Sequence, residues 1–183
     1  MKVLWDLDGT IIDSWPTLVE AFIQVSGKDL DREDVLPRLK YGTAYSDYGV
    51  PAYKITEFRD IERIFAHDRK PLFPFVQDVL LRADLNVLVT HRNRRSTEAL
   101  LDYWDLSPFF MEVICPEDDG YSPKPDIDAY EYLQKRYGIQ LAIGDQETDL
   151  IPARALGMAT CSFQNPNEYA DYCFSCYSEF KIF

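Results

Sequence analysis

The sequence predicts an α/β fold, in which a parallel sheet is covered by helices and a small helical domain is inserted after the first strand. Between residues 76 and 163, short apolar runs alternate with amphipathic segments, which is typical of parallel strands joined by helices. A further apolar run, Val3–Trp5, lies near the start of the chain, and the intervening residues 15–75 carry helical patterns only. We therefore expect a core of residues 1–14 and 76–183 and an inserted α-helical cap of residues 15–75.

The first strand and the first helix follow from local signals. Val3–Trp5 is a continuous apolar run, as expected for a strand of a parallel sheet that is buried on both faces. Gly9 allows the chain to leave this strand in a sharp turn. Ser14 is the expected N-cap of a helix that has Pro16 in its first turn and ends at Gly27.

The cap is expected to contain two further helices. Asp31 is the expected N-cap of a helix over 31–39, and another helix is expected over 56–66. The helix over 56–66 has an apolar face made of Phe58, Ile61, Ile64 and Phe65. The stretch 41–51 is rich in turn residues and is expected to form turns.

After the cap, helices and strands alternate along the chain. Helices are expected over 76–83, 96–104, 127–137 and 150–156, and strands over 87–90, 112–115, 141–144 and 158–163. An aromatic tail follows, with Tyr169, Tyr172, Phe174, Tyr177, Phe180 and Phe183. We expect this tail to form a last helix and strand packed on the sheet, and an oligomer contact is the alternative.

Composition narrows the class of protein. With 183 residues, of which 46% are hydrophobic and 27% charged, the chain suits one globular domain with a small insertion. The net charge of −12 disfavours nucleic acid and anionic membranes as partners, because both bind basic surfaces. No apolar stretch reaches the roughly 20 residues that span a bilayer, and no signal peptide is recognised. We expect a cytoplasmic protein, either a monomer or a weak homodimer.

The four cysteines and two histidines predict neither a disulfide framework nor a His-rich metal site. Cys173 and Cys176 form a C-x-x-C pair, but a zinc site needs a second pair or nearby histidines. We interpret these two residues as plain thiols.

Polar side chains follow four of the predicted strands, close to the points where these strands end. They are Asp6 with Asp8, then Thr90, then Lys124, and finally Asp145 with Asp149. The carboxyl ends of parallel strands meet at one edge of a sheet, where open α/β sheets bind ligands. The sequence therefore predicts that these side chains converge. Two carboxylates as close as Asp6 and Asp8 also need a cation or a shared proton to relieve their repulsion.

Each of these groups suits phosphate chemistry. One carboxylate of the pair formed by Asp6 and Asp8 can attack phosphorus, while the other acts as general acid and then as general base. Mg²⁺ prefers carboxylate, water and phosphate oxygens, and Asp145 offers a further ligand. Thr90 can donate its hydroxyl to a phosphate oxygen, and Lys124 can bring positive charge to the phosphate and hold the nucleophile in place.

The order of these residues resembles the four motifs of the haloacid dehalogenase superfamily of phosphohydrolases. The motifs are Asp6-Leu7-Asp8-Gly9-Thr10, Val87-Leu88-Val89-Thr90, Ser122-Pro123-Lys124-Pro125, and Gly144-Asp145 with Asp149. The helical block is similar to the α-helical cap of that superfamily, and the chain looks most like its phosphoglycolate-phosphatase-like members. The resemblance implies a three-layer, Rossmann-like core.

The resemblance also implies roles for the acidic residues. Asp6 would be the nucleophile and Asp8 the acid/base, with Thr90 and Lys124 completing the catalytic set. Mg²⁺ would be bound by the side chain of Asp6, the backbone carbonyl of Asp8, and the acidic residues of the fourth motif. In that motif, Asp145 would be a direct ligand, and Asp149 would act directly or through water.

Candidate substrate-binding residues are Gly9, Thr10, His91 and Arg92, which lie in or directly after the first two motifs. His91 stands where the family commonly has a small residue or asparagine. A guanidinium after Thr90 can form a fork with a second anionic group of the substrate, and the run contains Arg92, Arg94 and Arg95. The alternative, which we favour for the run as a whole, is the solvated start of a helix.

Taken together, the motifs predict a Mg²⁺-dependent phosphatase that acts on a small phosphorylated metabolite through an aspartyl-phosphate. Phosphoglycolate-like compounds, sugar phosphates and nucleotides are the candidate substrates. A sugar phosphomutase of the same superfamily would keep these motifs and remains the main alternative. A signalling module phosphorylated on aspartate is disfavoured, because such modules place the acceptor on a middle strand, whereas Asp6 and Asp8 follow the first.

Overall fold

The computed structural model describes residues 1–181. The chain divides into two compact units: Met1–Ile12 with Leu72 onward form the larger one, and Asp13–Pro71 form the smaller one. In the larger unit, an antiparallel bridge joins Ile12 to Leu72, so the points where the chain leaves and re-enters this unit are held together. No helix within residues 1–181 is both long and apolar enough to cross a bilayer.

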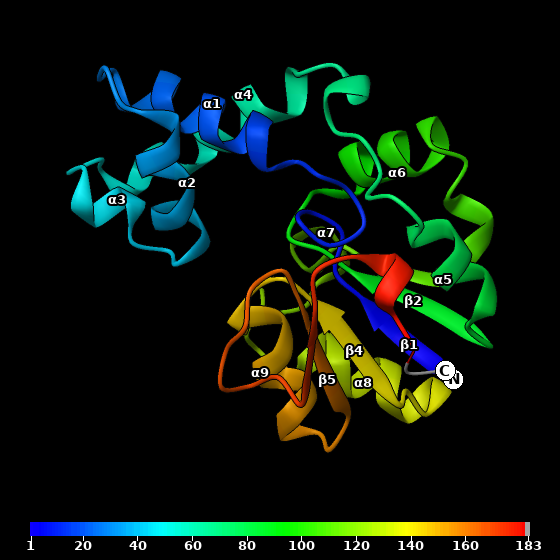
Figure 1. Cartoon of the computed structure of the whole chain (residues 1–183). Coiled ribbons are helices and arrows are strands. Elements are labelled where there is room, and N and C mark those ends of the chain that lie inside the picture. Colours follow the sequence, from blue (N-terminus) through cyan, green and yellow to red (C-terminus); the bar gives the residue numbers. More distant parts are fainter. Residues whose placement is uncertain (182–183) are drawn as a thin grey trace. The chain divides into compact units, whose positions relative to one another are not determined.

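The larger unit is built on a parallel sheet that has six strands within the described residues (Figure 1). The strands are β1 (Lys2–Trp5), β2 (Leu85–Val89), β3 (Phe110–Ile114), β4 (Leu141–Gly144), β5 (Ala159–Phe163) and β6 (Tyr172–Phe174). Their order across the sheet is β3-β2-β1-β4-β5-β6, and each neighbouring pair is parallel. The predicted α/β, Rossmann-like fold is confirmed.

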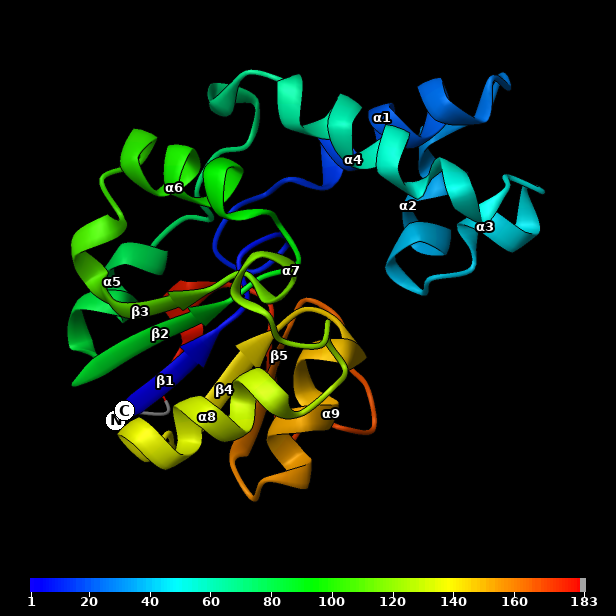
Figure 2. The ribbon, with the colours of Figure 1, turned by 180° about the vertical axis from the view of Figure 1, so that it is seen from behind.

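Helices cover both faces of this sheet and give three layers (Figure 2). They are α5 (Val76–Arg82), α6 (Arg94–Tyr103), α7 (Pro116–Asp119), α8 (Asp128–Tyr137) and α9 (Glu147–Ala155). Helices α5 and α6 pack on one face, and α8 and α9 pack on the other. Successive residues of β1 alternate between the faces: Trp5 packs with α5 and α6, whereas Leu4 packs with α8. A strand covered in this way needs the continuous apolar run from which β1 was predicted.

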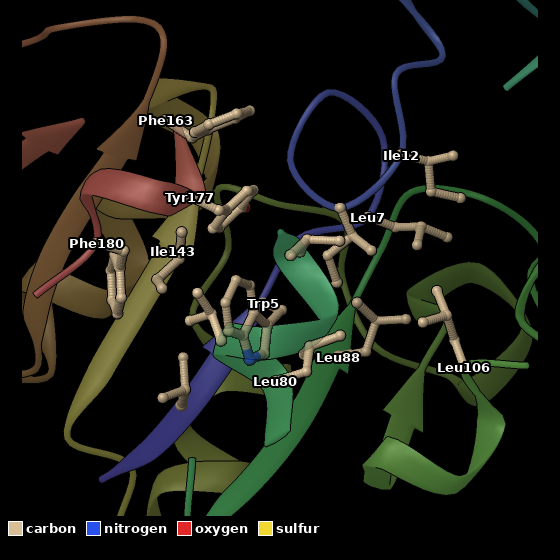
Figure 3. Close-up of a cluster of buried hydrophobic side chains, with 14 of the residues drawn as sticks. Trp5, Leu7, Ile12, Leu80, Leu88, Leu106, Ile143, Phe163, Tyr177 and Phe180 are labelled. Carbon is tan, nitrogen blue, oxygen red and sulfur yellow. The ribbon is translucent and has the colours of Figure 1, made fainter. Parts of the chain in front are cut away.

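The apolar layer between the sheet and helices α5 and α6 surrounds Trp5 (Figure 3). The Trp5 side chain is fully buried, and its Nε1–H donates a hydrogen bond to Asn86 Oδ1 at 2.8 Å. The aromatic tail completes the layer: Tyr177, in the 3₁₀ turn η4 (Tyr177–Glu179), stacks on Phe163 with a ring-centroid distance of 4.7 Å. Within the described residues, the tail thus contributes the expected strand, β6, and a 3₁₀ turn in place of the expected helix. Phe183 lies outside the described residues.

Two core helices begin earlier than predicted. Helix α6 begins at Arg94 because the side chain of Asn93 caps it, accepting from Ser96 N–H at 2.9 Å. Helix α9 begins at Glu147 because Gln146 and Asp149 form a capping box, in which each side chain accepts from the backbone N–H of the other. The apolar periodicity starts only after these polar turns, so it places both starts too late.

The smaller unit is entirely helical within Asp13–Pro71. Its elements are α1 (Trp15–Ser26), α2 (Arg32–Lys40), α3 (Ala44–Asp47), α4 (Ile55–Ile64) and the 3₁₀ turns η1 (Ala52–Lys54) and η2 (His67–Arg69). The apolar core of this unit is formed by Val19, Phe22, Val25, Val35, Ala44 and Val50. Helix α3 was not predicted, because its four residues are too few to show a helical period.

In the helical unit, one predicted helix cap is confirmed and two other predictions are wrong. Asp31 caps α2 as predicted, accepting from Glu33 N–H at 2.9 Å. Ser14 occupies the N-cap position of α1 but makes no capping bond, since its φ and ψ are helical and its buried hydroxyl has no partner among the described residues. On α4, Ile64 is 81% exposed and does not belong to a buried apolar face.

The residue of α4 that is buried instead is Glu62, and a lysine explains why. Lys70 has no exposed surface, and its Nζ lies 3.1 Å from Glu62 Oε1. The same ammonium donates to the backbone carbonyls of Glu62 at 2.9 Å and Phe65 at 3.2 Å. Thr17 donates its hydroxyl to Glu62 Oε1 at 3.3 Å. The helical unit therefore encloses a paired charge, which is tolerated because both ions have hydrogen-bonding partners.

Candidate active site

The candidate site lies at the carboxyl edge of the two central strands of the sheet. Strand β1 pairs with β2 on one side and with β4 on the other, so the strand order reverses direction between β1 and β4. Ligands of open α/β sheets bind at such a switch point. Asp6 directly follows β1 and Asp145 directly follows β4, and Asp6 N–H donates to Ile143 O at 2.9 Å. The pairing of the strands therefore places the two carboxylates side by side.

Asp6 is buried and held on both of its carboxylate oxygens. Lys124 Nζ lies 2.7 Å from Asp6 Oδ1, and Thr10 donates its hydroxyl to Asp6 Oδ2 at 3.2 Å. The pKa of Asp6 is raised to about 7, first by burial and then by the charge of Asp149, while Lys124 opposes both. A carboxylate in such a place stays ionised at neutral pH only when enough positive charge is near it.

Lys124, in the third motif, contacts a residue of each of the other three motifs. Its Nζ lies 2.7 Å from Asp6 Oδ1, 2.5 Å from Asp149 Oδ1 and 3.2 Å from the carbonyl oxygen of Val89. Burial alone lowers the pKa of Lys124, but the charges of Asp149 and Asp6 outweigh it, and the pKa is raised well above its usual value. The ammonium therefore remains charged and can hold Asp6 in one orientation.

The fourth motif is a compact turn between β4 and α9. Asp149 Oδ2 accepts from Gln146 N–H at 3.0 Å, which completes the capping box, while Asp149 Oδ1 receives Lys124. Gly144 is required by this geometry, because a Cβ at that position would lie 2.3 Å from the Cβ of Asp149. The side chain of Asn165 donates to the carbonyl of Asp145 at 2.8 Å and fixes the start of the turn.

Three buried carboxylates of the site are arranged as a metal could use them. Asp6, Asp145 and Asp149 each offer an oxygen, and these oxygens lie within 4.8 Å of one another. An all-oxygen, anionic donor set suits a hard cation such as Mg²⁺. Asp6 and Asp149 each receive hydrogen bonds on both oxygens, Asp6 from Lys124 and Thr10 and Asp149 from Lys124 and Gln146.

Asp8 has a different partner from these carboxylates. Arg92 donates to it through Nε, 3.0 Å from Oδ2, and through Nη2, 2.6 Å from Oδ1. Arg92 was predicted to bind the substrate, and its pairing with Asp8 was not predicted. The register of β1 against β2 could have indicated this pair. Trp5 pairs with Leu88, and the same offset continued beyond the strand ends brings Asp8 beside residues 91 and 92. Register is not readable from one sequence, so the pair was missed.

The remaining candidate residues have defined places. Thr90 is buried at the end of β2, and its hydroxyl oxygen accepts from Arg92 N–H at 3.2 Å. The Nε2 of His91 lies 3.2 Å from the carbonyl of Lys124, so this nitrogen carries a proton in the contact. Gly9 has a φ of +82°, which a glycine adopts without strain. His91 therefore contacts Lys124, which holds Asp6, and Thr90 contacts Arg92, which holds Asp8.

The other two arginines of the run after Thr90 do not share this arrangement. Arg94 forms a two-armed pair with Asp119, through Nε at 3.2 Å and Nη2 at 2.6 Å. Asp119 lies at the end of α7, and Arg95 is exposed. The expected solvated helix start thus describes Arg94 and Arg95 better than Arg92, whose side chain is 3% exposed.

Comparison with known proteins decides the family. The family model described as haloacid dehalogenase-like hydrolase matches residues 3–163, which include every residue of the site. The chain belongs to the haloacid dehalogenase-like hydrolases. The predicted resemblance is confirmed, and the protein is an enzyme of a hydrolase family.

Relatives and solved structures agree with this assignment. Pyrophosphatase PpaX of Bacillus mycoides is 25% identical over 173 residues, which cover 86% of this chain and 80% of that protein. A hydrolase from Streptococcus pneumoniae superposes with a TM-score of 0.65 at 27% identity, covering 90% and 92% of the two chains. The HAD-hydrolase YfnB of Bacillus subtilis, described as bound to magnesium, has a TM-score of 0.69 at 18% identity and covers 97% and 95%; its likeness concerns the fold alone.

A buried hydroxyl in this haloacid dehalogenase-like core allows a test of the packing beneath the site. Tyr130 of α8 is fully buried, and its hydroxyl has no hydrogen-bond partner within residues 1–181. Tyr130→Phe is therefore expected to leave the free energy of unfolding unchanged or to raise it by up to about 1 kcal/mol, because no bond is lost and an unsatisfied group is removed. Urea unfolding of the native and variant chains measures the difference.

Tyr177 provides the matched control. Its hydroxyl is also buried, but it donates to the carbonyl of Thr10 at 2.8 Å. Tyr177→Phe is expected to lower the free energy of unfolding by about 1 kcal/mol or more, since the carbonyl of Thr10 loses its donor. Equal losses in the two variants would show that the Tyr130 hydroxyl has a partner after all.

Proposed function

We propose that the chain is a Mg²⁺-dependent phosphohydrolase that cleaves a small phosphorylated compound through an aspartyl-phosphate on Asp6. The observation that carries the proposal is the placement of Asp6, buried at the switch point of the sheet with Lys124 2.7 Å from one oxygen and the carboxylate of Asp145 beside it. A carboxylate fixed between an ammonium and a cation-binding cluster is suited to attack an anionic phosphate.

The residues of the chain divide the reaction between them. An oxygen of Asp6 forms a bond to phosphorus while the bond from phosphorus to the leaving oxygen breaks, and Asp8 gives its proton to that oxygen. In the second half, a water oxygen attacks the same phosphorus, Asp8 takes up a proton of that water, and phosphate leaves Asp6. Lys124 keeps Asp6 oriented throughout.

The cation has a defined place in this proposal. Asp6 and Asp145 would hold Mg²⁺, with the backbone carbonyl of Asp8 as a further ligand, and Asp149 would orient its water. When bound, Mg²⁺ supplies positive charge that balances the phosphate oxygens. The donor set of three buried carboxylates supports this assignment, and the magnesium named for the related fold of YfnB is in line with it.

The substrate class is proposed more broadly than the sequence suggested. Phosphomonoesters such as phosphoglycolate, sugar phosphates and nucleotides suit the motifs. Relatives named pyrophosphatase, at 25% identity, add inorganic pyrophosphate to the candidates. In each case the transferred group is a phosphoryl group, and Asp8 faces the oxygen that leaves.

The experiment that tests the proposal is release of phosphate from pyrophosphate and a panel of phosphomonoesters, with Mg²⁺ or with EDTA. We expect release that requires Mg²⁺ and that falls by a factor on the order of a thousand or more in Asp6→Asn, because the nucleophile is lost. Asp102→Asn, a matched change at an exposed residue of α6, should keep full activity.

Three outcomes would contradict the proposal. Normal turnover by Asp6→Asn would exclude the aspartyl-phosphate. Undiminished release in EDTA would exclude the cation. Formation of an isomerised sugar phosphate in place of free phosphate would identify a phosphomutase instead.

A further inference from the structure

The guanidinium of Arg92 binds the carboxylate of Asp8 in a two-armed contact. Its Nε lies 3.0 Å from Asp8 Oδ2 and its Nη2 lies 2.6 Å from Asp8 Oδ1, so both carboxylate oxygens are engaged. The arginine side chain is 3% exposed, whereas that of Asp8 is 23% exposed. A planar guanidinium that binds both oxygens fixes the plane and the direction of the carboxylate, which a point charge does not do.

Arg92 is itself held at two further points. Its Nη1 donates to Ser96 Oγ at 3.0 Å, and its backbone N–H donates to the hydroxyl oxygen of Thr90 at 3.2 Å. Ser96 belongs to the first turn of α6, where its N–H is bound by the capping side chain of Asn93 at 2.9 Å. The orientation of Asp8 is thus set through residues at the end of β2 and the start of α6, two elements of the larger unit.

We propose that Arg92 is a positioning residue for Asp8, fixing the carboxylate that exchanges a proton with the leaving oxygen and with water. The proposal rests on the proposed function. A carboxylate offers about four lone-pair sites, so the two-armed contact leaves sites on both oxygens for that exchange. Of the five N–H donors of a guanidinium, three are already used by Asp8 and Ser96. Because most of its N–H donors are engaged within the protein, Arg92 suits a positioning role better than the substrate-binding role suggested by its place after Thr90.

The position of a proton donor matters most when the leaving oxygen is basic. An alkyl phosphate such as glycerol phosphate releases an alkoxide that needs a proton as its bond breaks, whereas para-nitrophenyl phosphate releases a phenolate that hardly needs one. The value of kcat/KM reports the step in which the leaving oxygen departs. The ratio of the two kcat/KM values therefore measures how well Asp8 is placed, independently of the amount of folded enzyme.

The decisive variant is Arg92→Met, which keeps the bulk of the side chain and removes the fork. We expect kcat/KM for the alkyl phosphate to fall by about 30- to 300-fold, because misplacing a general acid by about 1 Å forfeits much of its contribution. For the nitrophenyl ester the fall should stay under about threefold. Arg92→Lys keeps the charge without the fork and should be intermediate, and Ser96→Ala should show the same selective loss to a smaller degree.

Arg94, which lies two residues after Arg92 and begins α6, offers a matched control. It makes the same kind of two-armed pair, with Asp119, but outside the site. Arg94→Met should leave the ratio of the two kcat/KM values unchanged, whatever it does to stability. If Arg94→Met shifts the ratio as much as Arg92→Met, or if Arg92→Met lowers both values equally, the positioning role is wrong.

A second measurement does not depend on turnover. In the native chain, the Nε–H of Arg92 should exchange slowly with solvent in a proton–nitrogen NMR spectrum, and Asp8→Asn should make this exchange fast. Fast exchange in the native chain would overturn the fork itself. The native chain could instead show slow exchange of this N–H and release no phosphate from any substrate. That result would overturn the proposed function and the role of Arg92 in it, but it would leave the ion pair between Arg92 and Asp8 established.

Discussion

Lys70→Met is expected to lower the free energy of unfolding of the helical unit by about 3–5 kcal/mol, because it leaves the carboxylate of Glu62 buried without its cation. Lys70 and Glu62 have 0% and 4% of their side-chain surfaces exposed, so water does not replace the lost partner. The carbonyl of Phe65 would lose the Lys70 donor as well, and that of Glu62 would keep only the N–H of Phe65 among the donors seen in the described residues. Urea unfolding followed by circular dichroism measures the loss.

Two further chains test the cause of this loss. In Glu62→Leu with Lys70→Met, both charges are replaced by apolar side chains of similar volume, and much of the stability should return. Lys54→Met breaks a more exposed pair with Glu57, whose N–O distance is 3.5 Å, in the same unit, and should cost at most about 1 kcal/mol. A Lys70→Met chain no less stable than Lys54→Met would mean that water reaches Glu62.

Gly144→Ala is expected to lower kcat/KM on the order of a hundredfold and the free energy of unfolding by about 1–3 kcal/mol. The added Cβ would lie 2.3 Å from the Cβ of Asp149 and 2.6 Å from its Oδ2. Neither atom is the free end of a flexible chain, because Asp149 is bound by Gln146 and Lys124. Relief of the clash must shift α9, and that shift would pull Lys124 away from Asp6.

Gly138→Ala is the control for the loss of a glycine. Gly138 follows α8 with a φ of +66°, and a Cβ there would meet nothing within 4 Å. We expect a loss of about 1 kcal/mol from the left-handed backbone, with kcat/KM unchanged. Phosphate release and urea unfolding on the same preparations separate the two effects, and a fully active Gly144→Ala chain would show that the turn of the fourth motif adapts freely.

The placement of the site was predictable from the sequence because it depends on topology alone. Once β1 and β4 are recognised as parallel strands of one sheet, Asp6 and Asp145 must meet at its carboxyl edge, as they do. Lys124 and Asp149 reach the same place from the third and fourth motifs. The catalytic and binding roles of these residues stay predictions, since they concern chemistry that geometry alone does not test.

The features that were missed depend on pairings between distant residues. Glu62 reads as a polar residue of an exposed helix face until Lys70 is known to lie against it. Asp8 and Arg92 are 84 positions apart and meet only through the register of β1 and β2. Ser14 has the residue type of an N-cap, but its backbone is already helical, so the hydroxyl cannot reach an N–H. Side-chain type predicts local structure well only where the partner is also local.

The burial of Trp5 makes its fluorescence a probe of unfolding. Two of the three tryptophans are strongly buried and lie in different units: Trp5 in β1, directly before Asp6, and Trp15 at the start of α1, 7% exposed. Indole fluorescence moves to longer wavelength when water reaches the ring. In variants that keep only Trp5 or only Trp15, the emission therefore reports the opening of the sheet or of the helical unit, so that local unfolding of one can be told from global unfolding of both.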